Sequence, residues 1–346
     1  MIKVFKRQRA YGFFDNDLRL TKLTKLGDPL VKLKEKVDFN LFKSFLMEKL
    51  LPTTQENKGG RPPYDYVTMF KILILQRYYN LSDDNIEFQI NDRMTFMRFL
   101  DFTIADDIPD SRTVWFFKEK LIDLDLIEPL FLIFITHLQT LSLELKEGKI
   151  IDASFIEVPR QRNSKAENEL IKKGEIPETF IQKPCKLAQK DLDATWTKKN
   201  NLTFFGYKNH VKVDKKFKII TSYLTTTACV HDSQALEKLL DSNDNGVELY
   251  ADSAYTGEKQ EATINSHNMV NKVHEKGVRN HPLTQDQKDS NTLKSRTRAR
   301  VEHVFGFMEG SMNGMYLHSI GIKRINAAIG MMNLTYNMFR KLQLGW

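Results

Sequence analysis

Residues 149–158 read KIIDASFIEV, and an aspartate, Asp152, lies inside this β-rich run. Gly148 and Pro159 bound the run, so it predicts a β-strand. Aspartate is disfavoured within strands, so its presence here needs a reason. We expect either a chemical role for Asp152 or a salt bridge to Lys149 or to an arginine.

Further strands and helices follow this run. Residues 202–214 and 217–230 predict two strands joined by a tight turn at Asp214 and Lys215. Residues 246–255 (GVELYADSAY) predict a fourth strand that ends at Asp252. The remaining predicted elements are helices at 236–240 and near 257–267, a short strand at 269–273, and a long helix from about residue 292.

The chain before residue 147 has a helical periodicity instead. Apolar residues recur at three- and four-residue steps over 39–50, and 64–79 is apolar on most sides, so this second helix must be buried. Ser82 and Asp110 predict N-caps of two further helices, and another helix is expected over about 125–146. Basic residues interleave with these helices, which is compatible with a helix-turn-helix-like module and also with a plain helical or dimerisation bundle.

The predicted organisation is therefore an all-helical N-terminal domain, residues 1–146, followed by an α/β domain, residues 147–346. We expect the second domain to contain a mixed sheet with flanking helices. Residues of about 160–200 are polar, with few large apolar side chains, and predict an insertion rather than core.

Three carboxylates occur in core-like contexts: Asp152, Asp252 directly after a strand, and Glu302 within the apolar helix 296–308. Burying an unpaired charge is costly, and a divalent cation held by oxygen ligands is a common reason for such acids. Each acid also has a simpler explanation. Asp252 could start a turn with Ser253, and Glu302 could pair with Arg298 one turn earlier.

On the first strand, the fourth strand and a later helix, the three acids match the ribonuclease-H-like plan. The sequence also resembles the DDE transposases of bacterial insertion sequences, specifically insertion-sequence family five. The resemblance covers about residues 145–342 well. It rests on the strings IIDASFIEVPRQRN (150–163), DLDATWTKKN (191–200), FGYKNHVKVD (205–214), VHDSQAL (230–236), LYADSAY (249–255), RTRARVEHVFGFMEGSMNG (296–314) and IGIKRINAAIGMMNLTYNM (320–338). GGRPPYDYVTMFKILILQRYYNLSD (59–83) resembles the N-terminal helical domain of the same family.

This resemblance implies that Asp152, Asp252 and Glu302 form the DDE triad and bind two Mg²⁺ or Mn²⁺ ions. It implies a transposase that binds terminal inverted repeats, nicks DNA by hydrolysis and joins the freed 3′-hydroxyl to target DNA, as a homodimer on double-stranded DNA. In the wider family signature around the glutamate, Arg298 matches, whereas Ser295 and Glu309 stand where Tyr and Lys would be. The alternatives are a ribonuclease-H-like nuclease that only hydrolyses and a catalytically silent DNA-binding derivative.

Several basic residues are candidate DNA contacts. Lys208 and His210 share one face of a strand next to that of Asp152, where they could touch the scissile phosphate or form a solvated basic face. Lys294 and Arg298 precede Glu302 on nearly the same face of the predicted helix, where we expect them to line the DNA path. The remaining candidates are Arg296, Arg300 and, in the turn NKGGRPP (57–63), Arg61.

Composition and charge indicate which partners and which compartment to expect. The net charge of +8 is modest, but residues 1–40 hold ten Lys or Arg against five acids, and residues 270–300 hold eight against three, which favours a polyanion partner. No apolar run approaches the roughly 18–20 residues of a membrane-spanning helix, so no membrane partner is expected. Cys185 and Cys229 have neither disulfide nor metal spacing, which favours the reducing cytoplasm, at the nucleoid when the protein is bound to DNA.

Overall fold

The computed structural model describes residues 12–51, 62–141, 145–199, 201–278 and 281–346. Within them, six strands form one mixed sheet in the order β2-β3-β1-β5-β6, with β4 paired to β3. Strand β1 pairs antiparallel with β3 and parallel with β5, and β6 continues the parallel part. The strands are β1 (Lys149–Glu157), β2 (Thr195–Lys199), β3 (Leu202–Asp214), β4 (Ile220–Thr227), β5 (Glu248–Tyr250) and β6 (Val270–Asn271).

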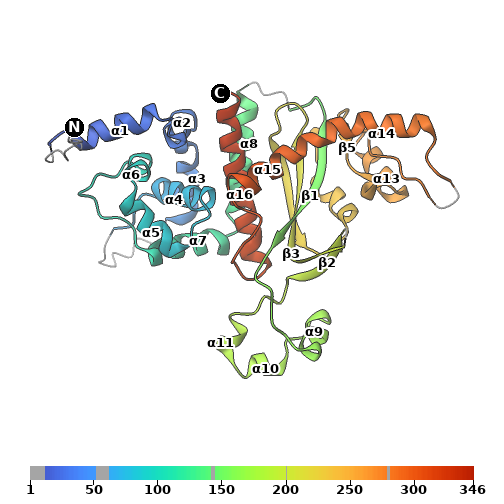
Figure 1. Ribbon diagram of the computed structural model, residues 1–346, viewed down its shortest axis with the longest axis horizontal. Helices are drawn as coiled ribbons and strands as arrows, with labels where there is room; N and C mark the ends of the chain where they lie inside the picture. Colours follow the sequence, from blue (N-terminus) through green and yellow to red (C-terminus); the bar gives the residue numbers. More distant parts are fainter. Residues whose placement is uncertain (1–11, 52–61, 142–144, 200, 279–280) are drawn as a thin grey trace, which may run out of the picture.

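The N-terminal part of the described chain is helical, as expected (Figure 1). The predicted caps are confirmed: the Ser82 hydroxyl accepts from the Asn85 N–H, and the Asp110 carboxylate accepts from the Thr113 N–H. The helices are α1 (Asp15–Lys25), α2 (Pro29–Lys36), α3 (Lys43–Leu50), α4 (Tyr66–Tyr78), α5 (Asp83–Asp92), α6 (Met94–Leu100), α7 (Ser111–Asp123) and α8 (Ile127–Thr140), with a 3₁₀ turn at Phe39–Phe42.

The C-terminal part contains the sheet and further helices, several of which pack on the sheet. One hydrophobic cluster, including Leu236, Tyr255 and Ile264, packs α12 and α13 on one face of the sheet. The elements are α9 (Lys165–Lys172), α10 (Glu178–Ile181), α11 (Pro184–Leu187), α12 (Leu236–Leu239), α13 (Glu258–Ser266), α14 (Gln285–Arg298), α15 (Glu302–Gly310) and α16 (Ile322–Gln343), with 3₁₀ turns η2 (Asp232–Ala235), η3 (Ser242–Asp244), η4 (Ser253–Tyr255) and η5 (Ala299–Val301).

Helix α16 joins the two parts of the chain. It packs against β4 on one side and against α8, α4 and α2 on the other. Buried amides fix its register: Asn333 and Asn209 exchange two side-chain hydrogen bonds, and the Asn337 amide bonds both the N–H and the C=O of Ile220. A single hydrophobic cluster therefore runs from the N-terminal helices through α16 to the sheet.

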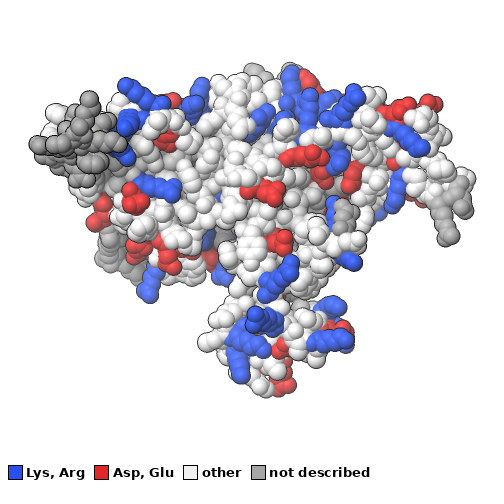
Figure 2. All heavy atoms as spheres, viewed as in Figure 1, with Lys and Arg blue, Asp and Glu red and all other residues white. Residues whose placement is uncertain are grey.

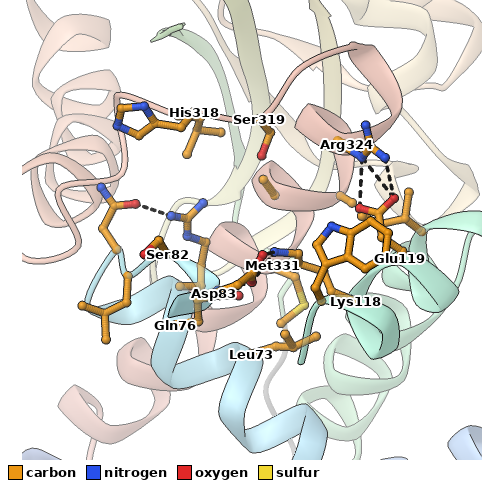
Figure 3. Close-up of a pocket in the computed structure, with 18 of the residues that line it drawn as sticks. Leu73, Gln76, Ser82, Asp83, Lys118, Glu119, His318, Ser319, Arg324 and Met331 are labelled. Atoms are coloured by element: carbon orange, nitrogen blue, oxygen red, sulfur yellow. Dashed lines mark hydrogen bonds and ion pairs between the residues drawn. The ribbon is translucent and has the colours of Figure 1, made fainter. Parts of the chain in front are cut away.

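A second contact between the two parts lies at a cavity of about 480 Å³ between α4, α7 and α16. Figure 3 shows the Arg324 guanidinium of α16 directed at the neighbouring Glu119 carboxylate of α7 in the wall of this cavity. Arg324 Nη2 lies 2.7 Å from Glu119 Oε2, and Arg324 Nε lies within 3.1 Å of both carboxylate oxygens. This bidentate geometry is the strong form of an arginine–carboxylate pair.

The polar segment between β1 and β3 is an insertion in part. Helices α9, α10 and α11 form a small lobe that projects from the body, and Figure 2 shows Lys and Arg side chains gathered on it. The predicted limit of 200 is wrong, because residues 195–199 form strand β2 and extend the sheet through pairing with β3. Their polar composition hid this strand: it lies at the end of the sheet, where one side faces solvent and side chains such as Trp196 remain exposed.

Within the described ranges, no helix combines the length and apolar character needed to cross a membrane.

Candidate active site

Two of the predicted acids lie in one row across neighbouring strands, with Asp152 inside β1 and Asp252 two residues past the end of β5. Strands β1 and β5 are parallel, and Ile150 pairs with Tyr250. Asp152 and Asp252 each lie two residues beyond this pair, so the alternation of a strand turns both toward the same face. The carboxyl ends of parallel strands are where α/β proteins bind ligands.

The same row continues to the next strand. Leu249 pairs with Asn271 of β6, and the His274 N–H donates to the carbonyl of Ala251. His274 therefore lies beside Asp252, three residues past the last β6 pair. Its pKa is lowered by burial and by the positive charges of Arg298 and Lys294. No sequence motif identified His274, because it follows a strand that is only two residues long.

Asp152 is partly buried, and both of its carboxylate oxygens are hydrogen-bonded. Its Oδ1 accepts from the Ala153 N–H at 2.9 Å, and its Oδ2 accepts from Arg298 Nη1 at 2.8 Å. Burial raises the pKa of Asp152 above its ordinary value, and the nearby charge of Asp252 raises it further. The Ala153 N–H and the Arg298 guanidinium oppose this shift. Its expected salt bridge to an arginine is thus present, and the partner is Arg298.

Asp252 also has the simpler role that its sequence allowed. It caps the 3₁₀ turn η4, where its Oδ1 accepts from the Ala254 N–H at 2.8 Å. The same turn buries Tyr255, whose hydroxyl has no hydrogen-bond partner among the described residues. The pKa of Tyr255 is raised by burial and by the charges of Asp232, Asp152 and Asp252.

Glu302 is not part of this row. Its side chain is exposed and lines a hollow with Lys218 and Arg340. The alternative explanation of Glu302, an ion pair with Arg298, is not present in the structure, because Arg298 bonds Asp152 instead.

A local change in helix geometry accounts for this. The single predicted helix is divided into α14 and α15 by the 3₁₀ turn η5. An α-helix turns by about 100° per residue and a 3₁₀-helix by about 120°. Four α-helical steps would place Glu302 about 40° from Arg298, whereas three 3₁₀ steps and one α-helical step place it about 100° away. Arg298 thus faces Asp152 while Glu302 faces the hollow.

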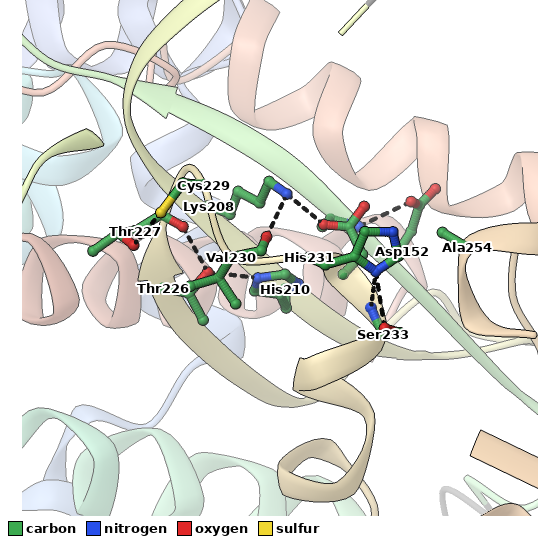
Figure 4. A network of polar contacts seen from close by, with 12 residues as sticks. Asp152, Lys208, His210, Thr226, Thr227, Cys229, Val230, His231, Ser233 and Ala254 are labelled. Atoms are coloured by element: carbon green, nitrogen blue, oxygen red, sulfur yellow. Dashed lines mark hydrogen bonds and ion pairs between the residues drawn. The ribbon is translucent and has the colours of Figure 1, made fainter. Parts of the chain in front are cut away.

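The basic face predicted on β3 is buried rather than solvated. His210 is fully buried, and its Nε2 lies 2.8 Å from the Thr226 hydroxyl. Lys208 donates to the Val230 carbonyl and to Asp232, both at less than 3 Å (Figure 4). Lys212 is also buried, between Asp241 and Asp244. The prediction that His210 touches a phosphate is wrong for this structure, because no part of its ring reaches the surface.

His231, in contrast, has the role of a cap. Its Nδ1 accepts from the Ser233 N–H at the start of the 3₁₀ turn η2, and Figure 4 shows its ring directed toward Ser233.

The residues present can be compared with the needs of a divalent cation. Carboxylate oxygens are the ligands that Mg²⁺ and Mn²⁺ prefer, and Asp152 and Asp252 place such oxygens side by side. Among the described residues, no group of three or more Asp, Glu, His or Cys side chains lies close enough to hold a metal ion. Two of the three implied ligands therefore fit, and the third, Glu302, would have to rotate toward them.

Comparison with known proteins decides the family. The family model described as the transposase DDE domain matches residues 144–338, which is more than half of the chain. The chain belongs to the DDE transposase family. A second family model, described as a transposase domain (DUF772), matches residues 18–120. The expected α/β class, a mixed sheet with flanking helices preceded by a helical N-terminal part, is confirmed by the structure.

Two solved structures are similar to this transposase. One is a piggyBac transposase synaptic complex with hairpin DNA, at 12% identity and a TM-score of 0.48, covering 92% of this chain and 75% of that chain. The other is a pre-cleavage Mos1 transpososome, at 11% identity and a TM-score of 0.18, covering 97% of each chain.

The basic residues of α14 and η5 are arranged differently from the prediction for this transposase. Lys294 is tied to the sheet edge, where its ammonium bonds the Val273 carbonyl and Glu275. Arg298 is tied to Asp152. Arg296 and Arg300, which were also candidate DNA contacts, are exposed. Arg61 lies outside the described residues.

Proposed function

We propose that this chain is the transposase of an insertion sequence of family five. In this proposal it binds the terminal inverted repeats, nicks each end and joins it to target DNA. The observation that supports this most directly is the row of Asp152 and Asp252, each two residues beyond the last parallel pair of β1 and β5. Its place within a DDE transposase domain gives the row its chemical meaning.

The reaction consists of two displacements at phosphorus. In the first, a water oxygen attacks the phosphorus at the element end, the bond to the 3′-oxygen breaks, and a 3′-hydroxyl and a 5′-phosphate are formed. In the second, that 3′-hydroxyl attacks a phosphodiester of target DNA, loses its proton and displaces a new 3′-hydroxyl. The number of phosphodiester bonds is conserved in the second step, so no nucleotide cofactor is needed.

Asp152, Asp252 and Glu302 are proposed to hold two Mg²⁺ or Mn²⁺ ions. When bound, such ions activate the attacking oxygen and stabilise the leaving one. Asp152 must then be ionised, and the Arg298 guanidinium favours that form by hydrogen bonding to it. His274, at the end of the same row, lies where it could accept a proton from an attacking hydroxyl, because burial and nearby cations keep it neutral.

Partner and assembly follow from the reaction. Double-stranded DNA is the substrate as both element end and target, and two ends must be paired before joining. We therefore propose a homodimer on DNA, acting in the cytoplasm at the nucleoid.

A strand-joining assay separates this proposal from its two rivals. The full chain is incubated with Mg²⁺, a labelled duplex carrying the inverted repeat that flanks its gene, and supercoiled plasmid as target. The proposal predicts labelled DNA covalently joined to the plasmid, abolished by a chelator. A nuclease that only hydrolyses would give nicked ends without joined product. A silent derivative would bind the duplex and leave it intact.

A further inference from the structure

A basic hollow lies on the opposite side of η5 from Asp152. It has a volume of about 540 Å³, and its lining includes Lys218, Glu302, His303, Tyr336 and Arg340. The walls come from three separate parts of the chain: the turn between β3 and β4, the η5–α15 segment, and the last turns of α16. Arg300 of η5 lies close enough to influence the charge of Lys218.

The arginines at this hollow bond backbone carbonyls, and the Glu302 carboxylate in the same lining forms no ion pair with them among the described residues. Arg300 Nη1 donates to the Lys215 carbonyl at 2.8 Å, and Arg340 Nε donates to the Phe217 carbonyl at 2.7 Å. Among the described residues, neither of these arginines nor Lys218 forms an ion pair with a carboxylate. Other cations of the molecule differ in this respect, since Arg324 pairs with Glu119 in bidentate geometry.

The three positive charges also repel one another. The pKa of Lys218 is lowered, first by burial and then by the charges of Arg340 and Arg300. Crowded like charges raise the free energy of a folded protein unless an anion joins them.

The backbone at Lys218 is unusual as well. Its φ of +59° is in the left-handed region, which non-glycine residues other than Asn and Asp seldom adopt. A lysine therefore occupies a turn position for which Gly or Asn would be easier to fold. This turn brings the lysine to the hollow rather than to an acidic partner.

We propose that this hollow binds a backbone phosphate of double-stranded DNA through Lys218, Arg300 and Arg340. The inference rests on the proposed DNA-binding function and names residues for it. Arginine and lysine form charge-assisted bonds to phosphate oxygens, and such contacts fix the position of a duplex without reading its sequence. Because Glu302 lies in the same hollow, a phosphate held there keeps the strand beside the predicted third acid.

The salt dependence of DNA binding tests this inference. The full chain and its Lys218→Asn and Arg340→Gln variants are titrated with a short duplex of arbitrary sequence over a range of salt concentrations. Each lost phosphate contact lowers the slope of log affinity against log salt by roughly 0.9. We expect each single variant to lose part of this slope, and the double variant to lose close to the full value for one phosphate.

Two features keep the test specific. Lys218→Asn retains a residue that tolerates the left-handed backbone, so the turn is preserved while the charge is removed. Arg324→Gln is the matched control, because it removes an arginine from the same helix whose charge already has a partner. Its slope is expected to equal that of the wild type, and thermal unfolding of every variant checks the fold.

The outcomes separate this inference from the proposed function. A wild-type chain that binds no DNA contradicts the proposed function itself. A wild-type chain that binds with a clear salt slope, together with folded Lys218→Asn and Arg340→Gln variants whose slopes are unchanged, overturns the assignment of this hollow alone. An equal loss of slope in Arg324→Gln also overturns the assignment of this hollow. The slope would then depend on the net charge of the protein and not on where the charge lies.

Discussion

His210 illustrates how burial sets the properties of a single residue. Its imidazole is fully enclosed within the sheet, and its Nδ1 has no partner among the described residues. Burial lowers its pKa to about 4, a shift that Asp232 opposes and Lys208 reinforces. The folded state therefore keeps His210 neutral over a pH range in which the unfolded chain binds a proton.

This gives a prediction for stability against pH. Below about pH 6.5 the unfolded state binds more protons at this site, so wild-type stability should fall between about pH 6.5 and 4. Over this whole interval, the difference in proton binding lowers the free energy of unfolding by about 3 kcal/mol. His210→Gln should lose less stability over this interval, whatever its stability at pH 7, as measured by urea unfolding at several pH values.

The exposed His303 on α15 provides the control. His303→Gln should retain the wild-type pH dependence, because His303 is exposed on α15 and lies outside the buried surroundings of His210. If His210→Gln follows the wild-type curve, protonation of His210 is not linked to unfolding.

At the same scale, the sequence was most informative where a residue type conflicted with its surroundings. Asp152 was a candidate site residue because an aspartate is unusual within a strand. Asp252 was a candidate because it directly follows a strand. Lys208 and His210 could not be placed, because alternation gives the face of a strand but not what covers it. Both are covered in the fold, by the segment from Val230 to Asp232 and by β4.

At the scale of elements, α14, η5 and α15 show the limit of periodicity. The apolar pattern predicted one helix carrying both Arg298 and Glu302, and helical backbone is indeed present throughout. A tighter turn of three residues changes the rotation between them, and the pattern of side chains does not encode so small a difference. Arg298 and Glu302 consequently lie on different faces, with Arg298 bonded to Asp152 and Glu302 in the hollow, whereas the prediction placed them on nearly the same face.

Helix α16 depends on close approach at Gly330. A methyl group there would contact the Tyr223 hydroxyl and lie 2.7 Å from Ile127 Cγ2, so β4 and α8 would both have to shift. Overpacking of this kind costs about 1–3 kcal/mol, against a gain in helix propensity of about 1 kcal/mol. Gly330→Ala should therefore be destabilised by up to about 2 kcal/mol in urea unfolding.

Gly306 of α15 is the matched position without this constraint. Nothing lies within 4 Å of the added methyl group, so Gly306→Ala should gain stability through helix propensity, by about 0.5–1 kcal/mol. Equal gains at both glycines would show that α16 is not packed as closely as described.

At the scale of the whole molecule, the helical N-terminal part and the sheet share one core through α16. The division at residue 146 was predicted from a change of periodicity and remains a prediction, but the C-terminal helix packs among the N-terminal ones. A fragment that ends near residue 125 would expose the apolar faces that α16 covers. Tests of end recognition therefore belong on the full chain.

The central claim is that Asp152, Asp252 and Glu302 carry the metal-dependent chemistry of this transposase. Loss of a group next to a metal ligand costs roughly 10–100-fold in activity, so loss of a ligand should cost more. The matched control is Glu309→Gln, which removes an exposed acid from the same helix as Glu302.

The most direct measurement is the yield of joined product from full-length Asp152→Asn, Asp252→Asn and Glu302→Gln variants with Mg²⁺, alongside their affinity for the end duplex. We predict that each variant loses joining activity by more than roughly 100-fold and still binds the duplex with nearly wild-type affinity. The Glu309→Gln control should keep its joining activity. Near-wild-type joining by Asp152→Asn or Asp252→Asn would contradict the assignment of the site. Near-wild-type joining by Glu302→Gln alone would show that Glu302 stays in the basic hollow and is not the third ligand.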